Sequence, residues 1–333
     1  MTPFTGMPMP QVKISFIVPT YNEAARIGPV LEHATRWADE VVIMDKGSTD
    51  GTLDICRNAG EKVFIRTIPF SERGHEKVSE IPGLVWNDWV FVGTCSEIPT
   101  KKLIAACRQI LDQRESELDL VYVPRRMYAF GLHCSNPDWS VCHYPSLFHR
   151  RRARVTDDVH DNFHAPDPAR TARIPYAEDC CVHHMTYPTA RSFWLASMQY
   201  FEAEIKKDPS PDKSIRQSFK NIERISQKVL QDGENWIPFY CAFVSYELGK
   251  ALHVWEKARG REQAPLLYKN LTDHVLASEW TNPSASSAPL PTAPGGVSVP
   301  GVKPLAAALA RLPYLLIKGA MLLRKLGLAR RSK

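Results

Sequence analysis

The sequence has 333 residues, which is enough for one large domain or two ordinary ones with a sizeable buried core. Hydrophobic residues make up 44% and charged residues 23%, which excludes a disordered chain, a collagen-like repeat and a small disulfide-stapled protein. The net charge of +6 is unevenly placed, because residues 303–333 contain eight Lys or Arg and no acid. The rest of the chain, with 34 basic and 36 acidic residues, carries a net charge of −2.

Cysteine usage and the N-terminus indicate a cytoplasmic protein. The eight cysteines are scattered without a C-x-x-C pair, which favours reduced thiols over a disulfide framework. The first ten residues lack the basic and apolar regions of a secretory signal. No apolar run reaches the roughly 18 residues that a membrane-spanning helix needs, so we expect no spanning segment.

The first 125 residues alternate short apolar runs with amphipathic segments. The run VKISFIVP at 12–19 has the composition of a buried parallel strand, and Thr20-x-x-Glu23 has the spacing of a capping box that would start a helix. Further strands are predicted at 41–44, 62–66, 88–92 and 120–123, with helices at 27–38 and around 53–56. This alternation predicts an α/β fold with a mostly parallel sheet.

Beyond about Pro188 the pattern becomes helical, with apolar residues at helical spacing in 194–205 and 240–252. Residues 281–304 are rich in Pro, Ser and Gly and cannot pack a core, so they are expected to be a linker. We therefore predict an α/β domain over residues 1–190, a helical region over 191–280, the linker over 281–304 and a basic amphipathic tail over 305–333.

The tail is rich in leucine but interrupted by Pro313 and by basic residues. It is too charged to span a bilayer, yet it is suited to lie in a lipid interface, where each basic residue adds roughly 1 kcal/mol on anionic lipid. We expect attachment to the inner face of the membrane; the alternative is a helix that docks on its own domain or on a partner. Nucleic acid is not an expected partner, because no recognition motif is present and the body is slightly acidic.

Two polar loops follow predicted strands at the edge where ligands bind in open α/β sheets. They are Pro19-Thr20-Tyr21-Asn22-Glu23 after the first strand and DKGSTDGT, residues 45–52, after the second. Carboxylates there can accept hydrogen bonds from a base or a ribose, and glycines let a ligand approach the backbone closely. Taken singly, Thr20 and Asp50 could instead cap helices.

Together these loops resemble the opening of glycosyltransferase family 2, whose members are nucleotide-sugar transferases with the GT-A fold. The segment ISFIVPTYNEAARIGPVLEHATRWADEVVIMDKGSTDGT matches the family opening almost position by position. Further motifs are similar to those of bacterial lipopolysaccharide-core β-glycosyltransferases: IPFS (68–71), VPRRMYAFG (123–131), YPSLFHRRRARVTDDVHDNFH (144–164) and HHMTYPTARSFW (183–194). The resemblance covers about residues 12–205. It implies a GT-A-like (Rossmann-like) mixed, mostly parallel sheet flanked by helices.

The resemblance also implies a set of residues around a nucleotide-sugar donor. Glu23 would lie near the ribose, and Asp45 would meet the pyrimidine edge. Another residue, His184, matches a family histidine near the diphosphate; the alternative is a structural core histidine. The full set that would bind the nucleotide sugar is Pro19, Tyr21, Glu23, Asp45, Ser48, Asp50, Lys77, Arg125, Arg126 and His184.

The general base of the family lies in a Val-His-Glu-like motif, which here is Val159-His160-Asp161. Asp161 would take the proton from an acceptor hydroxyl as that oxygen attacks the anomeric carbon, and Asp158 is the second choice. An ordinary acidic loop is the alternative for both. Inversion at the anomeric carbon follows from the resemblance.

The chain departs from the family at the metal site. The family has Asp-x-Asp after the fourth strand, where it binds the divalent metal that neutralises the leaving diphosphate. Here Thr94-Cys95-Ser96 takes that place, and the following Glu97 is the one carboxylate that could bind a metal. Because Mn²⁺ and Mg²⁺ favour carboxylate oxygens, we expect no ordinary dependence on a divalent metal.

Two interpretations of this departure stay open. Cationic side chains could replace the metal, since fixed Arg or Lys can stabilise a developing diphosphate charge. The available ones are Arg73, Lys77, Arg125, Arg126 and the run Arg150-Arg151-Arg152, a run that could equally be a solvated surface strand. Alternatively the site has lost turnover and only binds a sugar nucleotide or a partner.

The sequence thus predicts an inverting glycosyltransferase that moves a sugar from a nucleotide donor to a glycan or lipid-linked acceptor in surface polysaccharide or lipopolysaccharide synthesis. The rival hypothesis is a family member that binds without turnover. A Rossmann-type dinucleotide enzyme is excluded, because no G-x-G-x-x-G follows the first strand.

Overall fold

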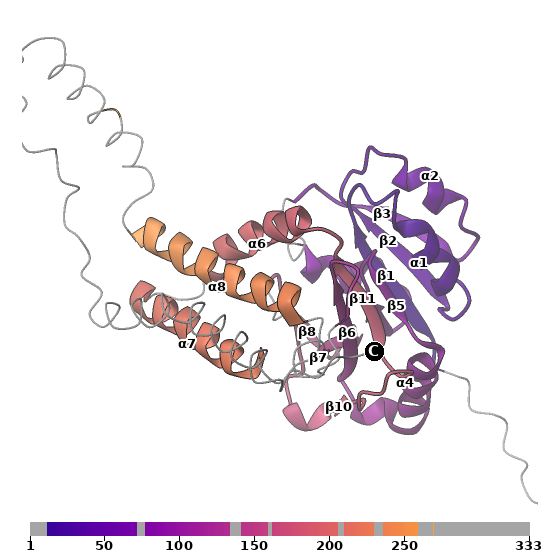
Figure 1. Ribbon diagram of the computed structural model, residues 1–333. Coiled ribbons are helices and arrows are strands. Elements are labelled where there is room, and N and C mark those ends of the chain that lie inside the picture. Colours follow the sequence, from indigo (N-terminus) through magenta and orange to yellow (C-terminus); the bar gives the residue numbers. More distant parts are fainter. Residues whose placement is uncertain are drawn as a thin grey trace, which may run out of the picture. The chain divides into compact units, whose positions relative to one another are not determined.

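The computed structural model describes residues 12–71, 77–133, 141–158, 162–205, 210–229, 236–258 and 269 (Figure 1). The chain divides into two compact units, one of residues 1–209 and 217–251 and one of residues 210–216 and 252–333. The first unit contains the sheet. In the second, the described residues other than 269 belong to the ends of two helices.

The elements follow one another along the chain in three stretches. The first comprises β1 (Ile14–Thr20), α1 (Ile27–Ala34), β2 (Glu40–Asp45), α2 (Thr52–Arg57), β3 (Val63–Thr67), η1 (Val78–Glu80), α3 (Ile81–Leu84) and β4 (Trp89–Val92). The second comprises β5 (Glu97–Pro99), α4 (Lys101–Arg114), η2 (Glu115–Glu117), β6 (Leu120–Ala129), β7 (Val141–His149), β8 (Arg154–Val155) and β9 (Phe163–His164). The third comprises η3 (Pro168–Arg170), β10 (Thr171–Arg173), β11 (Val182–Tyr187), α6 (Ala190–Ile205), α7 (Pro211–Val229) and α8 (Trp236–Ala258).

The described residues form one large mixed sheet in the order β3-β2-β1-β4-β7-β6-β11-β5, and β10 pairs with β6. Strands β3, β2, β1 and β4 are mutually parallel, whereas β7 runs antiparallel to both β4 and β6. The first strands are buried on both faces, which is why β1 and β2 are continuous apolar runs. The carboxyl ends of β1, β2 and β4 therefore lie side by side at one edge of the sheet.

Helices flank this sheet (Figure 1). Alternate side chains of β1 point to opposite faces of the sheet and pack in two separate cores. Phe16 and Val18 belong to a core with apolar residues of α1 and α4. Ile17 faces the other way, into a core that includes Ile81 of α3 and Phe148 of β7. This arrangement confirms the predicted α/β fold with a mostly parallel sheet flanked by helices.

The expected capping box at Thr20 is wrong. Thr20 is the last residue of β1, and its hydroxyl donates to the carbonyl of Val18 instead of capping a helix. Helix α1 begins at Ile27 after the non-helical residue Arg26, with no side-chain cap. The residues between them are left as a loop at the edge of the sheet, where they are available to a ligand.

The helical region after residue 190 is confirmed by α6, α7 and α8. Within the first unit, the backbone of α8 approaches α6 at Gly249, where an added Cβ would lie 2.9 Å from the ring of Phe201. No helix in the described part of the chain is long and apolar enough to cross a membrane. The predicted linker and tail lie outside the described residues, and the domain boundaries at 190, 280 and 304 stay predictions.

Candidate active site

Hydrogen bonds join the loops after β1 and β2 into one rigid rim. The backbone N–H of Asn22 donates to Ser48 Oγ at 2.9 Å, and the Thr49 N–H donates back to Asn22 Oδ1 at 2.8 Å. In a further hydrogen bond between the two loops, the backbone N–H of Ala24 donates to Asp50 Oδ2 at 3.1 Å. Asn22 adopts a positive φ of 52°, which Asn tolerates better than most residues and which turns the chain within the rim.

Asp45 shapes the second loop from beneath. Its carboxylate accepts the backbone N–H groups of Gly47 at 2.9 Å and Ser48 at 3.1 Å, and the residue has no exposed surface. Gly47 has φ of 90°, a conformation that L side chains rarely adopt. The described contacts therefore give Asp45 a loop-building role, and its contact with a base stays a prediction.

An exposed aromatic pair stands beside this rim. The rings of Tyr21, after β1, and Phe70, after β3, lie 4.9 Å apart, with exposed fractions of 43% and 56%. Between the two loops, the buried Lys46 reaches Ser71, with Nζ 2.8 Å from Oγ. Exposed aromatic rings at the carboxyl edge of an α/β sheet offer a flat surface on which a nucleobase can stack.

A buried charged cluster, Glu97–Arg125–His184, lies where the fourth strand ends. Glu97 Oε1 is 2.8 Å from Arg125 Nε and 3.3 Å from His184 Nδ1, while Arg125 Nη2 donates to Glu97 Oε2 at 3.4 Å. Arg125 also donates to Ser146 Oγ at 3.2 Å, and its guanidinium stacks 4.0 Å from the ring centroid of Tyr144. Four strands, β5, β6, β7 and β11, thus converge on one carboxylate.

Electrostatics keep the imidazole of this cluster neutral and connect it to the rim. Burial is the largest influence and lowers the pKa of His184; the negative charge of Glu97 opposes this, and the positive charges of Arg125 and Arg26 reinforce it. Arg26 belongs to the β1 loop, where it pairs with Glu23 at 2.5 Å. The hydroxyl of Thr20, at the end of β1, lies 3.8 Å from the Sγ of Cys95, two residues before Glu97, so the rim and the charged cluster lie at the same edge of the sheet.

The residues present do not fit a divalent cation. The hydroxyls of Thr94 and Ser96, at the positions of the family carboxylates, lie 3.0 Å from each other. Both oxygens of Glu97 already face Arg125. Across the described ranges, no group of three His, Cys, Asp or Glu could hold a metal ion. The expectation that Glu97 could bind a metal therefore finds no support in the geometry.

The loop that carries the predicted base is anchored at both ends. Strands β8 and β9 pair on either side of this loop. The side-chain amide of Asn162 donates to Thr156 O at 3.0 Å, and its Oδ1 accepts from Tyr144 Oη at 3.1 Å. Asp157 accepts the N–H of Ser79 at 2.8 Å. Asp158 is exposed, and Val159-His160-Asp161 lies outside the described residues.

The other predicted site residues lie apart from the Glu97–Arg125–His184 cluster. Pro19 is half-buried within β1. Lys77, at φ of 72°, pairs with Glu80 at 3.2 Å. Arg126 projects from the opposite side of β6 to Arg125, and its nearest ion partner is Glu178 at 3.5 Å. Arg73 lies outside the described residues.

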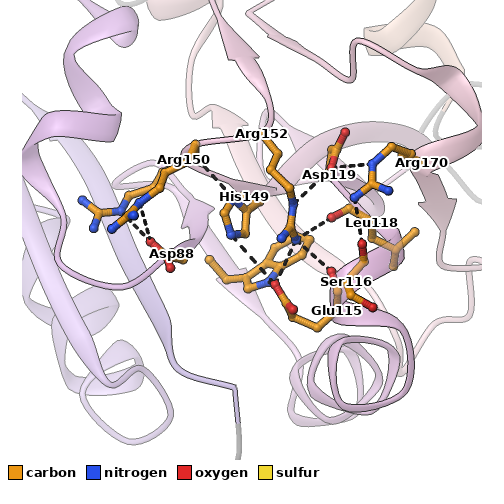
Figure 2. A network of polar contacts seen from close by, with 11 residues as sticks. Asp88, Glu115, Ser116, Leu118, Asp119, His149, Arg150, Arg152 and Arg170 are labelled. Carbon is orange, nitrogen blue, oxygen red and sulfur yellow. Dashed lines mark hydrogen bonds and ion pairs between the residues drawn. The ribbon is translucent and has the colours of Figure 1, made fainter.

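The run Arg150-Arg151-Arg152 is structural and makes ion pairs at the opposite edge of the sheet. Arg150 Nε is 3.1 Å from Asp88, which precedes β4, whereas the charged cluster follows β4. Arg152 holds η2 by donating to the carbonyls of Glu115 and Leu118, each at 2.8 Å (Figure 2). These arginines therefore cannot replace a metal near Glu97.

A surface hollow of about 710 Å³ also lies at that opposite edge, lined by residues such as Trp86, Asp88 and Arg151. Of the residues predicted for the site, it contains only Arg150 and Arg151 of the arginine run. Several functional candidates escaped the sequence analysis instead: Phe70, Lys46, Tyr144, Ser146 and Asn162. All five lie in recognisable motifs: Phe70 in IPFS, Lys46 in DKGSTDGT and the other three in the stretch 144–164. The motifs do not show which of these residues meet, because that depends on the pairing of strands distant in sequence.

Comparison with known proteins identifies the N-terminal part of the chain. Residues 15–77 match the model of the family described as Glycosyl transferase family 2. An uncharacterized glycosyltransferase of Rickettsia felis is 31% identical over 110 residues, which cover 33% of this chain and 38% of that protein. One from Rickettsia typhi is 35% identical over 78 residues, covering 23% and 26%. The chain thus matches less than two fifths of these relatives' length.

Solved structures show weaker likenesses. A mannosyltransferase, PcManGT, from Pyrobaculum calidifontis is 15% identical, with 83% of this chain and 84% of that chain covered and a TM-score of 0.40. Glucosyl-3-phosphoglycerate synthase from Mycobacterium tuberculosis is 22% identical, with 35% and 44% covered and a TM-score of 0.29. The strand order of the sheet, and not these likenesses, defines the fold.

Proposed function

We propose that this protein is an inverting glycosyltransferase that uses a nucleotide-sugar donor. The observation that carries the proposal is the shared rim of the β1 and β2 loops, which lies beside the buried charged cluster at the end of β4. The nucleobase would stack at Tyr21 and Phe70, and the ribose would meet Glu23. The diphosphate would then extend along the sheet edge toward Arg125.

The chemistry requires one base and one stabilised leaving group. The acceptor hydroxyl oxygen attacks the anomeric carbon and loses its proton to Asp161, while the bond from that carbon to the diphosphate oxygen breaks and the diphosphate leaves with the electron pair. Hydrogen bonds hold the described residues that flank Asp161 in sequence, Asp157 through Ser79 and Asn162 through Tyr144 and Thr156. Asp158 is the second choice.

A donor screen tests this function. Purified protein is incubated with a panel of nucleotide sugars, each with glycan and lipid-linked acceptors, and the released nucleoside diphosphate is measured. We expect turnover with one donor and a loss of at least about 100-fold for Asp161→Asn. The matched control is Asp167→Asn, because Asp167 only caps η3, through Ala169 N–H at 2.9 Å. Tight donor binding without turnover on any acceptor, unchanged by Asp161→Asn, would identify a binding protein instead.

The cellular role we propose is the synthesis of lipopolysaccharide or another surface polysaccharide at the inner face of the membrane. Sequence motifs and the basic, leucine-rich segment 305–333 support it. Deleting residues 303–333 should move the protein from the membrane fraction to the soluble fraction while donor binding persists. A truncated protein that stays with the membrane would contradict attachment through the tail.

A further inference from the structure

Glu97 is the one carboxylate retained near the position of the family's metal ligands, and the Arg125 side chain already contacts both of its oxygens. We infer that the Arg125 guanidinium takes the place of the divalent cation and binds the leaving diphosphate directly. This inference rests on the proposed function, since it names the group that receives the diphosphate charge at that site.

The geometry of the pair supports a built-in cation. Arg125 contacts Glu97 through two adjacent nitrogens, with Nε 2.8 Å from Oε1 and Nη2 3.4 Å from Oε2, a side-on arrangement that suits a planar carboxylate. The Glu97 side chain is 2% exposed, so it has no route to an outside ion that does not displace the arginine. His184 lies 3.3 Å from the same carboxylate and is the second side chain beside Arg125 that contacts it.

One end of the guanidinium remains for a ligand. Guanidinium has five N–H donors. Nη2 donates to Glu97 Oε2 and Ser146 Oγ, and Nε is in ion contact with Glu97 Oε1 without a hydrogen bond. Within the described part of the chain, Nη1 has no hydrogen-bond or ion partner, and the side chain keeps 11% of its surface exposed. Two N–H groups can therefore reach a phosphate oxygen at the sheet edge.

The surroundings fix this end in place before a ligand arrives. The ring of Tyr144 stacks against the guanidinium at 4.0 Å, and the same tyrosine is held through its hydroxyl by Asn162. Asn162 is held in turn by donating to the carbonyl of Thr156 at 3.0 Å. A preorganised donor stabilises developing charge without reorganising in the transition state.

Metal binding tests the inference without any need for turnover. The purified full-length protein is titrated with Mn²⁺ alone, and binding is followed by electron paramagnetic resonance. We expect no specific binding by the wild type. Arg125→Ala should gain a Mn²⁺ site whose affinity is at least about tenfold higher than any Mn²⁺ binding by the wild type. Glu97 and His184 would then be free ligands around the space that the guanidinium leaves. The double variant Arg125→Ala/Glu97→Gln should lose this site again.

A neighbouring arginine provides the matched control. Arg126→Ala removes the same charge from the same strand on its other face, so it should gain no Mn²⁺ site. If Arg125→Ala folds poorly, Mn²⁺ should raise its unfolding temperature and leave that of the double variant unchanged. The inference is overturned by stoichiometric Mn²⁺ binding to the wild type, or by failure of Mn²⁺ both to bind and to stabilise Arg125→Ala. A donor screen without turnover leaves these results intact, so failure of the proposed function is distinguishable.

Discussion

Arg152 anchors the edge of the sheet opposite the candidate site, and its removal should destabilise the fold without affecting the ligand. Its side chain, 29% exposed, donates to the carbonyls of Glu115 and Leu118 at 2.8 Å and lies 3.2 Å from Asp119. Arg152→Ala leaves two carbonyls without this donor, while Asp119 keeps its ion pair with Arg170 at 2.9 Å. Each lost hydrogen bond to a charged group costs about 1.5 kcal/mol, so we expect a loss of about 2–4 kcal/mol.

A loss of that size corresponds to a fall of about 5–15 °C in the unfolding temperature of a domain of this size. The matched control is Arg151→Ala, because Arg151 is 69% exposed and makes a single ion pair with Asp88 at 3.2 Å, worth under about 1 kcal/mol. Thermal unfolding of both variants gives the comparison, and calorimetric titration with a nucleoside diphosphate should give the same affinity for both. Equal unfolding temperatures, or a loss of ligand affinity in Arg152→Ala alone, would refute the structural role.

Three further predictions concern the site itself. Asp50→Ala removes the acceptor of the Ala24 N–H in the rim and of the Thr52 N–H at the start of α2, so nucleotide-sugar affinity measured by calorimetry should fall about tenfold and the unfolding temperature by a few degrees. Because burial lowers the pKa of His184, its unfolded form gains a proton first as pH falls below about 6.5, so stability drops there and His184→Gln should lessen the drop in unfolding temperature between pH 7.5 and 5.5. Burial raises the pKa of the Cys95 thiol to about 12, so iodoacetamide at pH 8 should label the exposed Cys241 and leave Cys95 unmodified in mass spectra.

Much of the fold follows from local pattern, because each parallel strand near the N-terminus is a short apolar run. The predicted run 41–44 lies within β2, and 88–92 contains β4. Strands β7 and β11 were not predicted, since both contain polar and half-buried residues and acquire strand structure by pairing with β6. Their pairing depends on contacts that no local periodicity records.

The candidate site divides in the same way. The rim residues Ser48 and Asp50 could be predicted, because they follow strands in a recognisable motif. The sequence could not show which arginine pairs with Glu97, since Arg125 and Arg152 both lie in runs of arginine. They differ in the end of the sheet at which each one lies. Only the antiparallel return of β7 places Arg152 away from the site and Ser146 beside Arg125.

A crystal structure of the protein with a nucleoside diphosphate, grown in excess EDTA, tests the central claim most directly. We expect the base at Tyr21 and Phe70 and a phosphate oxygen within about 3 Å of Arg125 Nη1. A nucleotide bound in the hollow beside Trp86 and Arg151, or one that enters the β1–β2 rim only when Mn²⁺ is supplied, would contradict it.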